Sequence, residues 1–226
     1  KCLEMKKEDG VTPKVTNNED GHIAEEKSDN HNDSLLNVTK SCAPTKIREI
    51  TTTIKQRPKL YLIIANISKP SNIKKLLLSS FAFGCRTVFV AGQKKFDFDG
   101  NNNDLPQSLR NLPPSVRLKI VQFEKLSDCI HHVKHVMGAR VCGVEIVEDA
   151  QDVQNDPFEI NSDGNGDTAI MMGNEGSGMN RRQLESCDYF VRISQFGSGT
   201  ASLNVYVAAS IVMHRFHHWS REYVKS

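Results

Sequence analysis

Two glycine-rich stretches in the last third of the chain combine residue types that can bind a ligand. The first is IMMGNEGSGMN, residues 170–180, where an apolar run ends in a loop that holds Glu175. Gly173 and Gly178 have the spacing of a phosphate-binding loop, but methionine and asparagine follow instead of lysine and serine or threonine. The Glu175 carboxylate would also repel a phosphate at roughly 4 Å by about 4 kcal/mol. Exposed amides beside a carboxylate favour a polar ligand with a positive centre, and a tight turn with a solvated glutamate is the alternative.

The second stretch is FGSGTASLN, residues 196–204, and it leads into a predicted helix whose first turn holds Ser202 and Asn204. Each glycine-rich stretch follows a predicted strand. Because the carboxyl ends of parallel strands meet at one edge of a sheet, where α/β proteins bind ligands, the two loops would lie side by side. The sequence therefore predicts one pocket that uses both loops.

The elements that would position these loops begin at Lys59, where short apolar runs start to alternate with helical patterns. Strands are predicted over residues 60–66, 87–92, 118–123, 140–146, 168–172 and 189–194. Helices are predicted over residues 72–84, 125–137, 180–186 and from about 202 to 219. The polar stretch 93–115 is interpreted as a mobile loop outside the core. This alternation predicts one α/β domain over residues 57–226.

Residues 1–56 differ from the rest in composition. They are rich in charged residues, asparagine and threonine and have few periodic apolar residues, so we expect a disordered, acidic and polar leader. Residues 1–40 carry six lysines against nine acidic residues, which leaves 23 basic against 18 acidic residues in the remainder. The predicted domain is therefore mildly basic, which permits nucleic acid binding without requiring it.

Cysteine and histidine spacing predicts no metal site and no disulfide framework. The six cysteines are widely scattered and are interpreted as reduced thiols, and the segments HHVKH and HRFHH lack a cysteine or glutamate at a ligand spacing. No apolar run approaches the ~20 residues of a membrane helix. An intracellular protein, cytoplasmic or nuclear and without a membrane partner, is expected. An organelle stays open, because the chain begins with lysine and a preceding transit signal could be missing.

Three blocks resemble the signature motifs of the SpoU/TrmH family of RNA 2′-O-ribose methyltransferases, within the SPOUT superfamily. They are NISKPSNIKKLLLSSFAFG at 66–84, IMMGNEGSGMNRRQLESCDYFVRIS at 170–194 and GTASLNVYVAASIVMHRF at 199–216. The resemblance implies a SPOUT-type knotted α/β fold: a mostly parallel sheet flanked by helices, with a C-terminal trefoil knot. It also implies S-adenosyl-L-methionine as cofactor, a ribose 2′-hydroxyl of tRNA or rRNA as methyl acceptor, and a homodimer that pairs through the knotted region.

The resemblance assigns roles to residues of the matching motifs. It implies cofactor binding by Val144, Glu145, Gly173, Asn174, Gly176, Gly178, Ile193, Ser202 and Leu203. It implies that the catalytic and RNA-facing region is built from Asn72, Glu175, Ser202 and Asn204. Basic residues near the ligand edge are candidates for a phosphate-binding stripe, with a solvated charged face as the alternative. These candidate RNA-binding residues are Lys74, Lys75, Arg86, Arg181 and Arg182.

Two positions depart from the family pattern, and the first is Lys74, which stands where the family usually has glycine. The arginine that the family places six residues after the motif asparagine is Leu78 here, and leucine can neither take up a proton nor clamp a phosphate. Three interpretations stay open. One of the five basic residues named above reaches the site from the same or a partner subunit, or the enzyme works by positioning alone, or the protein is an inactive relative that binds RNA or cofactor. The first two together favour an enzyme.

Overall fold

The structure is a computed structural model, and it describes residues 56–85, 87–99, 104–197 and 202–225. The predicted leader, apart from its last residue, lies outside the described residues. The same holds for Arg86 and for part of the second glycine-rich stretch. Within the described residues, no helix is long and apolar enough to cross a membrane.

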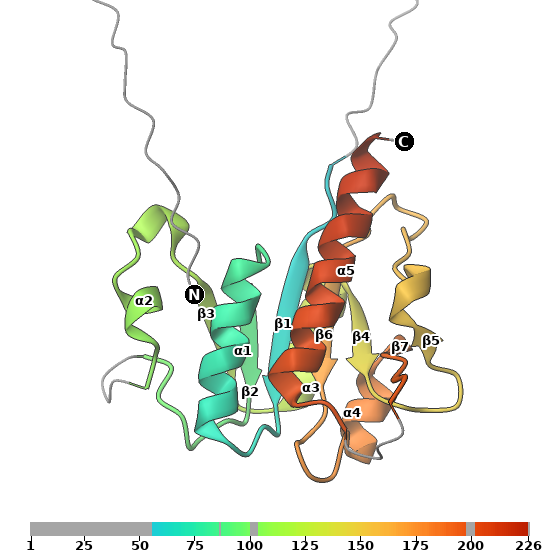
Figure 1. Ribbon diagram of the computed structural model, residues 1–226. Helices are drawn as coiled ribbons and strands as arrows, with labels where there is room; N and C mark the ends of the chain where they lie inside the picture. Colours follow the sequence, from blue (N-terminus) through green and yellow to red (C-terminus); the bar gives the residue numbers. More distant parts are fainter. Residues whose placement is uncertain (1–55, 86, 100–103, 198–201, 226) are drawn as a thin grey trace, which may run out of the picture. The chain divides into compact units, whose positions relative to one another are not determined.

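In the described part of the chain seven strands form one sheet, and every pair of neighbours is parallel (Figure 1). The strands are β1 (Leu60–Ala65), β2 (Thr87–Ala91), β3 (Lys119–Phe123), β4 (Arg140–Val144), β5 (Gln151–Asp152), β6 (Thr168–Met172) and β7 (Tyr189–Arg192). Their order across the sheet is β3-β2-β1-β6-β4-β7-β5. The predicted parallel α/β fold is confirmed, and the two-residue strand β5 is an addition that its polar sequence does not predict.

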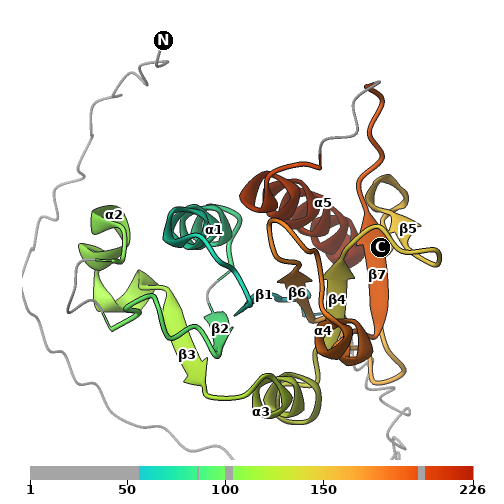
Figure 2. The ribbon, with the colours of Figure 1, turned by 90° about the horizontal axis from the view of Figure 1, so that it is seen from below.

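Helices cover both faces of the sheet. They are α1 (Pro70–Ala82), α2 (Gln107–Arg110), α3 (Leu126–His131), α4 (Arg181–Ser186) and α5 (Val205–Lys225). Figure 2 shows α1 and α5 on one face of the sheet and α3 and α4 on the other. Along β1, Leu62 and Ile64 pack in the core beneath α1 and α5, and Tyr61 and Ile63 pack in the core on the α3 side. Burial on both faces explains the near-continuous apolar sequence of this strand.

The helix α1 illustrates how the sequence sets local structure. Ile73, Leu76, Leu77 and Ser80 recur at helical spacing and are buried against the sheet and α5. The helix begins two residues earlier than predicted, at Pro70, which suits the first helical position because its missing N–H would have no helical partner. It ends before Gly84, whose φ of +79° favours glycine.

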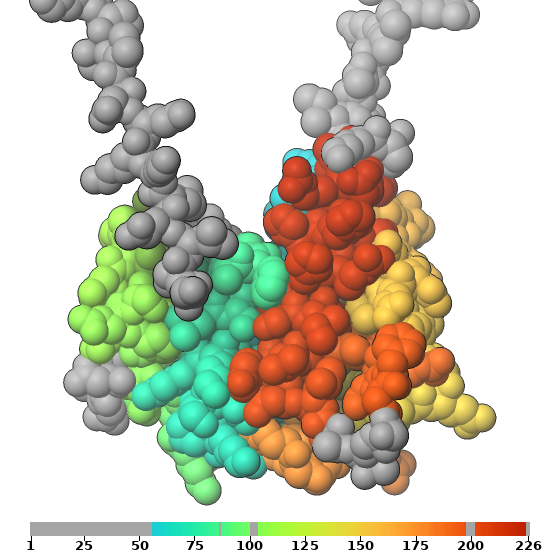
Figure 3. Space-filling view, viewed as in Figure 1, coloured from blue at the N-terminus to red at the C-terminus, as the bar shows by residue number. Residues whose placement is uncertain are grey.

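The helices α1 and α5 lie side by side, as the space-filling view shows (Figure 3). The Ser210 hydroxyl donates to the Ser79 hydroxyl at 2.9 Å, and the Lys75 ammonium lies 4.5 Å from the centroid of the Tyr206 ring. A largely apolar groove of about 470 Å³ follows the two helices. Its lining includes Phe83, Tyr206, Val207 and Ile211.

Two sequence predictions about the elements are wrong, and one predicted helix differs in its type. The stretch 93–115 does not lie outside the core, because among its described residues Phe96, Phe98 and Leu109 are buried in the core beneath α1, and α2 forms within it. The predicted helix 125–137 is confirmed as helical over residues 126–136, where α3 is followed by a π-helix, His132–Val136. The last helix, α5, begins only at Val205 and continues to Lys225, so Ser202 and Asn204 precede it.

Candidate active site

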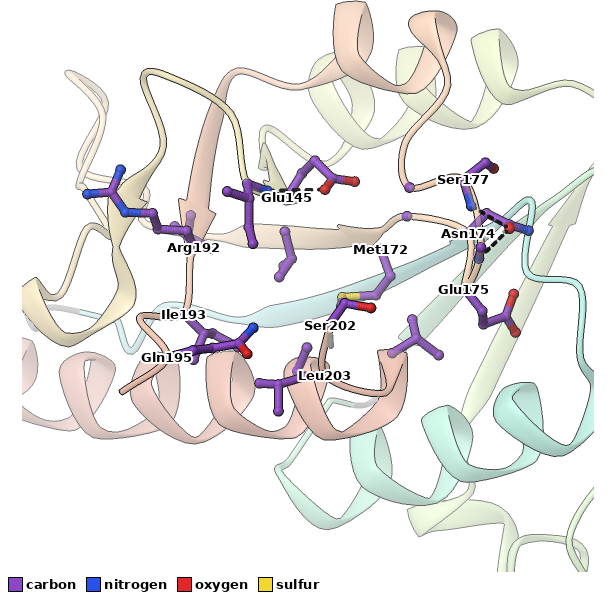
Figure 4. A pocket seen from close by; sticks show the side chains of 18 residues that line it. Glu145, Met172, Asn174, Glu175, Ser177, Arg192, Ile193, Gln195, Ser202 and Leu203 are labelled. Carbon is purple, nitrogen blue, oxygen red and sulfur yellow. Dashed lines mark hydrogen bonds between the residues drawn. The ribbon is translucent and has the colours of Figure 1, made fainter. Parts of the chain in front are cut away.

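A cavity of about 330 Å³ opens where β4, β6 and β7 end (Figure 4). Its lining comes from four segments, within residues 144–146, 172–178, 191–195 and 202–208. Because β4 lies between β6 and β7 in the sheet, the residues that follow β4 separate the two glycine-rich loops. The described parts of the two loops therefore share one pocket at the carboxyl edge of the sheet, as the sequence predicts.

The residues to which the sequence assigned cofactor binding all line this cavity. They are Val144, Glu145, Gly173, Asn174, Gly176, Gly178, Ile193, Ser202 and Leu203. Sequence reasoning missed eight further lining residues: Ile146, Met172, Ser177, Val191, Arg192, Gln195, Val205 and Ala208. The sequence offered one signal for them, which is that they lie at the ends of predicted strands or next to the two loops. Which of these residues face the cavity depends on the order of the strands in the sheet, and the sequence does not give that order.

Glu145 and two glycines pack closely on one side of the cavity. One Glu145 carboxylate oxygen, Oε2, accepts a hydrogen bond from the Met179 amide at 2.8 Å, and Oε1 accepts one from the Ile146 amide at 3.1 Å. A Cβ atom at Gly173 or Gly178 would lie 2.8 or 2.7 Å from Oε2. Gly178 also has a φ of +68°. Both positions therefore need glycine if Glu145 is to keep its place.

The Asn174 side chain forms hydrogen bonds within the first loop and to the segment after β1. Its side-chain Nδ2 donates to the Asn66 carbonyl at 2.9 Å and to the Ser68 hydroxyl at 2.7 Å. Its Oδ1 accepts from the Gly176 amide at 2.9 Å and from the Ser177 amide at 3.3 Å (Figure 4). The expectation that the loop amides are exposed to a ligand is therefore wrong for Gly176 and Ser177.

Glu175 faces the start of α1. Its carboxylate accepts hydrogen bonds from the Ser68 amide at 3.0 Å, the Lys69 amide at 3.1 Å and Asn72 Nδ2 at 2.9 Å. Partial burial raises the pKa of the Glu175 carboxyl, but these hydrogen bonds outweigh burial and the pKa lies below its usual value. Lys69 precedes α1 and supplies no side-chain cap. Glu175 therefore caps a helix that lacks a local cap.

The four predicted catalytic residues do not form one cluster. Glu175 and Ser202 line the cavity, and the buried Asn72 reaches it only through its hydrogen bond to Glu175. Asn204 does not line the cavity. Its Oδ1 accepts a hydrogen bond from the Tyr206 amide at 3.4 Å, and its carbonyl accepts one from the Val207 amide at 2.9 Å. Asn204 therefore caps the amino end of α5.

The candidate RNA-binding residues that the structure describes lie outside the cavity. Lys74 pairs with Asp104 at 3.8 Å, and Arg181 pairs with Glu185 at 2.7 Å. Leu78 lies on α1, 39% exposed, and does not line the cavity. Among the described residues, Arg192 is the only basic one that lines it. The Arg192 guanidinium donates to the Ala150 carbonyl at 2.7 Å and points away from Glu175 (Figure 4).

The start of α4 connects these segments to the end of β1. Asn180 and Gln183 form a capping box at the first turn of α4. The buried Gln183 side chain also donates to the Met172 carbonyl at 3.2 Å and to the Ala65 carbonyl at 3.4 Å. The ends of β1 and β6 and the first turn of α4 are thereby joined in one hydrogen-bonded unit.

The family model for the SpoU rRNA Methylase family matches residues 59–214. Among curated proteins, the chain is similar to 23S rRNA (guanosine-2′-O-)-methyltransferase RlmB of Coxiella burnetii, with 30% identity over 71% of this chain and 58% of the relative. The corresponding protein of Vibrio vulnificus is 28% identical over 68% of this chain and 57% of the relative. The chain thus spans less than two thirds of the length of these relatives.

Solved structures share the fold. An AdoMet-bound rRNA methyltransferase from Sinorhizobium meliloti matches with a TM-score of 0.57 and 18% identity, over 73% of this chain and 58% of that chain. The SpoU methyltransferase AviRb from Streptomyces viridochromogenes matches with a TM-score of 0.56 and 21% identity, over 74% and 62%. With the family match over residues 59–214, these findings establish that the chain belongs to the SpoU rRNA methylase family.

Proposed function

We propose that the protein is an S-adenosyl-L-methionine-dependent methyltransferase that acts on a ribose 2′-hydroxyl of tRNA or rRNA. The observation that carries this proposal is the single cavity that gathers every residue of the predicted cofactor set. Its volume of about 330 Å³ is in the usual range of small-molecule pockets. The names of the relatives, 23S rRNA 2′-O-methyltransferases, support the same reaction and RNA as the substrate class.

The residues around the cavity suit the proposed cofactor. Val144, Met172 and Leu203 offer apolar surface, and Ser202 and Glu145 offer polar groups. Among the described lining residues there are two carboxylates, Glu145 and Glu175, and one basic residue, Arg192, which points away from Glu175, so the field favours a ligand with a positive centre. When bound there, S-adenosylmethionine would supply a methyl group activated by its sulfonium.

The contribution of this chain to the reaction would be mainly positional. Methyl transfer to a hydroxyl needs the two reactants in line, and holding them so can account for most of the acceleration. Asn174 and Glu175 fix the first loop against the start of α1, which gives the cavity one rigid wall. The hydroxyl must also lose its proton. We infer that a basic side chain assisting this step would come from a partner subunit, because no basic side chain within the described residues points into the cavity.

A second candidate function is that of a binding protein without turnover. Leu78 in place of the family's arginine favours it. To separate the two functions, we would titrate the full chain with S-adenosylmethionine by calorimetry and measure transfer of a labelled methyl group to total tRNA and to rRNA. Binding with transfer supports the enzyme, and binding without transfer supports the second candidate. Leu78→Arg, measured beside wild type, then shows whether the native residue limits the rate.

We propose a homodimer that pairs through a knotted C-terminal region, as the family resemblance implies. The apolar groove along α1 and α5 supports this proposal because it leaves Tyr206, Val207 and Ile211 next to solvent. Light scattering behind size-exclusion chromatography gives the mass of the assembly. A monomer would exclude the dimer, and an experimental structure that traces residues 198–201 would test the knot.

The remaining proposals concern RNA contact and chain organisation. Lys74 and Lys75 belong to the first half of α1 and Arg181 and Arg182 to the first turn of α4, and we propose that they bind phosphates. Arg86 belongs to the same proposal. We further propose that residues 57–226 form the methyltransferase domain and residues 1–56 a disordered leader. Limited proteolysis should then remove the leader first and leave a stable domain.

A further inference from the structure

A short excursion of the chain, residues 147–156, lies beside the cavity, and we call it the β5 excursion. It begins directly after residues 144–146, which line the cavity, and its strand β5 pairs in parallel with β7. The chain leaves β7 through Ile193 and Gln195, which also line the cavity. The β5 excursion therefore adjoins two of the four lining segments.

Two side chains that flank Ile193 are hydrogen-bonded to the β5 excursion. On one side, the Arg192 guanidinium donates to the Ala150 carbonyl at 2.7 Å. On the other side, the Ser194 hydroxyl donates to Oδ2 of the Asp152 carboxylate. Covering the edge of β7 would require only the backbone hydrogen bonds of a short strand. The two side-chain contacts indicate that the β5 excursion also fixes the backbone around Ile193.

The Asp152 carboxylate is well suited to hold Ser194. Its other oxygen, Oδ1, accepts a hydrogen bond from the Gln154 amide at 2.8 Å, so the carboxylate is oriented within its own segment. The Ser194 hydrogen bond is the main cause that lowers the pKa of the Asp152 carboxyl below its usual value, and the Gln154 amide and the Arg192 charge add to it. Asp152 is therefore ionised at neutral pH, and a hydrogen bond to an ionised acceptor is stronger than one between neutral groups.

The β5 excursion is itself anchored to the rest of the domain. Val153 is buried in the core, next to Asp152 in the chain. The Arg215 guanidinium on α5 donates to the Gln154 carbonyl at 3.0 Å and pairs with Asp156 at 2.5 Å. A support can fix a cavity wall only if it is fixed itself, and α5 meets this condition.

We propose that Asp152 is a positioning residue for the methyl donor, because its hydrogen bond to Ser194 fixes the cavity wall that Ile193 and Gln195 form. Neither Asp152 nor Ser194 lines the cavity, so the effect on the donor passes through the backbone between them and the lining residues. This inference rests on the proposed function and deepens it by naming a residue outside the cavity on which donor binding depends. The start of the loop after β7 is then fixed, and its exposed part begins at Gln195.

The test measures by calorimetry the affinity of the full chain for S-adenosylmethionine. It compares wild type with Asp152→Ala, Ser194→Ala and the variant that carries both substitutions. Each single substitution should weaken binding about 5- to 20-fold, as expected for the loss of a hydrogen bond to a charged group. The double variant should bind no more weakly than Asp152→Ala, because both substitutions remove the same contact.

Two further variants separate positioning from a general effect on the fold. Asp152→Asn should bind the donor close to wild type, because the asparagine amide can donate to the Ser194 hydroxyl and its oxygen can still accept from the Gln154 amide. Gln151→Ala is the matched control, since Gln151 is the exposed neighbour of Asp152 on β5, and it should bind as wild type does. Circular dichroism and light scattering check that every variant keeps the fold and the mass of wild type.

The outcomes separate this inference from the function on which it rests. If wild type binds the donor and both single alanine variants bind it equally well, the positioning role is wrong and the proposed function stands. If the two losses multiply in the double variant, Asp152 and Ser194 act independently, which also overturns the inference. A merely structural contact would lower the free energy of unfolding in urea and leave the donor affinity of the folded protein unchanged. If wild type binds no donor, the proposed function itself fails and the inference fails with it.

Discussion

The two loops that line the cavity are built in opposite ways. In the loop after β6, the Asn174 and Glu175 side chains hold both the loop and the segment after β1 with hydrogen bonds of 2.7 to 3.3 Å. In the described part of the segment after β7, Phe196 and Leu203 leave apolar surface exposed. One side of the cavity is thus set by the fold before any ligand arrives, and the other side presents contact surface.

This difference suggests a division of labour in the proposed reaction. A small cofactor gains from a preformed wall, because binding then requires little ordering of the protein. An RNA substrate is large and must be released after each turnover, so its contacts belong on the exposed side. The predictions below test this division, beginning with the locked loop.

The largest effect is expected for Gly178→Ala. The new Cβ atom would lie 2.7 Å from the Glu145 carboxylate, and the φ of +68° adds a strain of about 1–2 kcal/mol. We expect cofactor affinity measured by calorimetry to fall roughly tenfold or more, since each 1.4 kcal/mol is tenfold. Gly164→Ala is the matched control, because Gly164 has a φ of +75° but open space around its Cβ. Equal cofactor affinity in the two variants would contradict the role of Gly178.

A smaller effect is expected for Glu175→Ala. The substitution leaves three donors at the start of α1 without their carboxylate, so the free energy of unfolding in urea should fall by about 2 kcal/mol. Glu175→Gln keeps one acceptor oxygen and should lose about half as much. If Glu175 were instead a proton acceptor in the reaction, Glu175→Gln would abolish methyl transfer without lowering stability.

The stability of the locked loop should also depend on pH. The pKa of Glu175 is lowered in the folded protein, so the unfolded state takes up the proton first as the pH falls. The stabilisation is complete above the ordinary carboxyl value of 4.5 and is lost as the pH falls through the lower folded value. The difference in unfolding free energy between wild type and Glu175→Gln should therefore shrink on acidification below pH 4.5. A constant difference would show that the charge of Glu175 contributes nothing.

The sequence predicts the parts of the site that depend on local pattern. Apolar runs gave the strands, and the motif glycines led to residues that do line the cavity. The sequence did not show that Asn174 Nδ2 and the Glu175 carboxylate hydrogen-bond to the segment after β1 and to α1, because these partners lie more than 100 residues away along the chain. It also missed the burial of Phe96 and Phe98, since their flanking aspartates made the segment look like a solvated loop.

The smallest effect is expected for the cations outside the cavity. Arg182→Ala should weaken RNA binding modestly and lower the slope of affinity against salt by about one unit if Arg182 contacts one phosphate. Lys119→Ala is the control. Lys119 is exposed at the start of the edge strand β3, and the cavity lies at the carboxyl ends of the inner strands β4 and β6 and of β7. Identical salt slopes for the two variants would remove Arg182 from the proposed RNA surface.

The central claim is that both loops form one site for the methyl donor, and a crystal structure of the protein with S-adenosylmethionine tests it most directly. We predict density for the ligand between Gly173 and Leu203, beside Glu145, with the loop after β6 unchanged. Density that touches neither Gly173 nor Leu203, or a loop whose Asn174 and Glu175 contacts have to break before the ligand fits, would contradict the account.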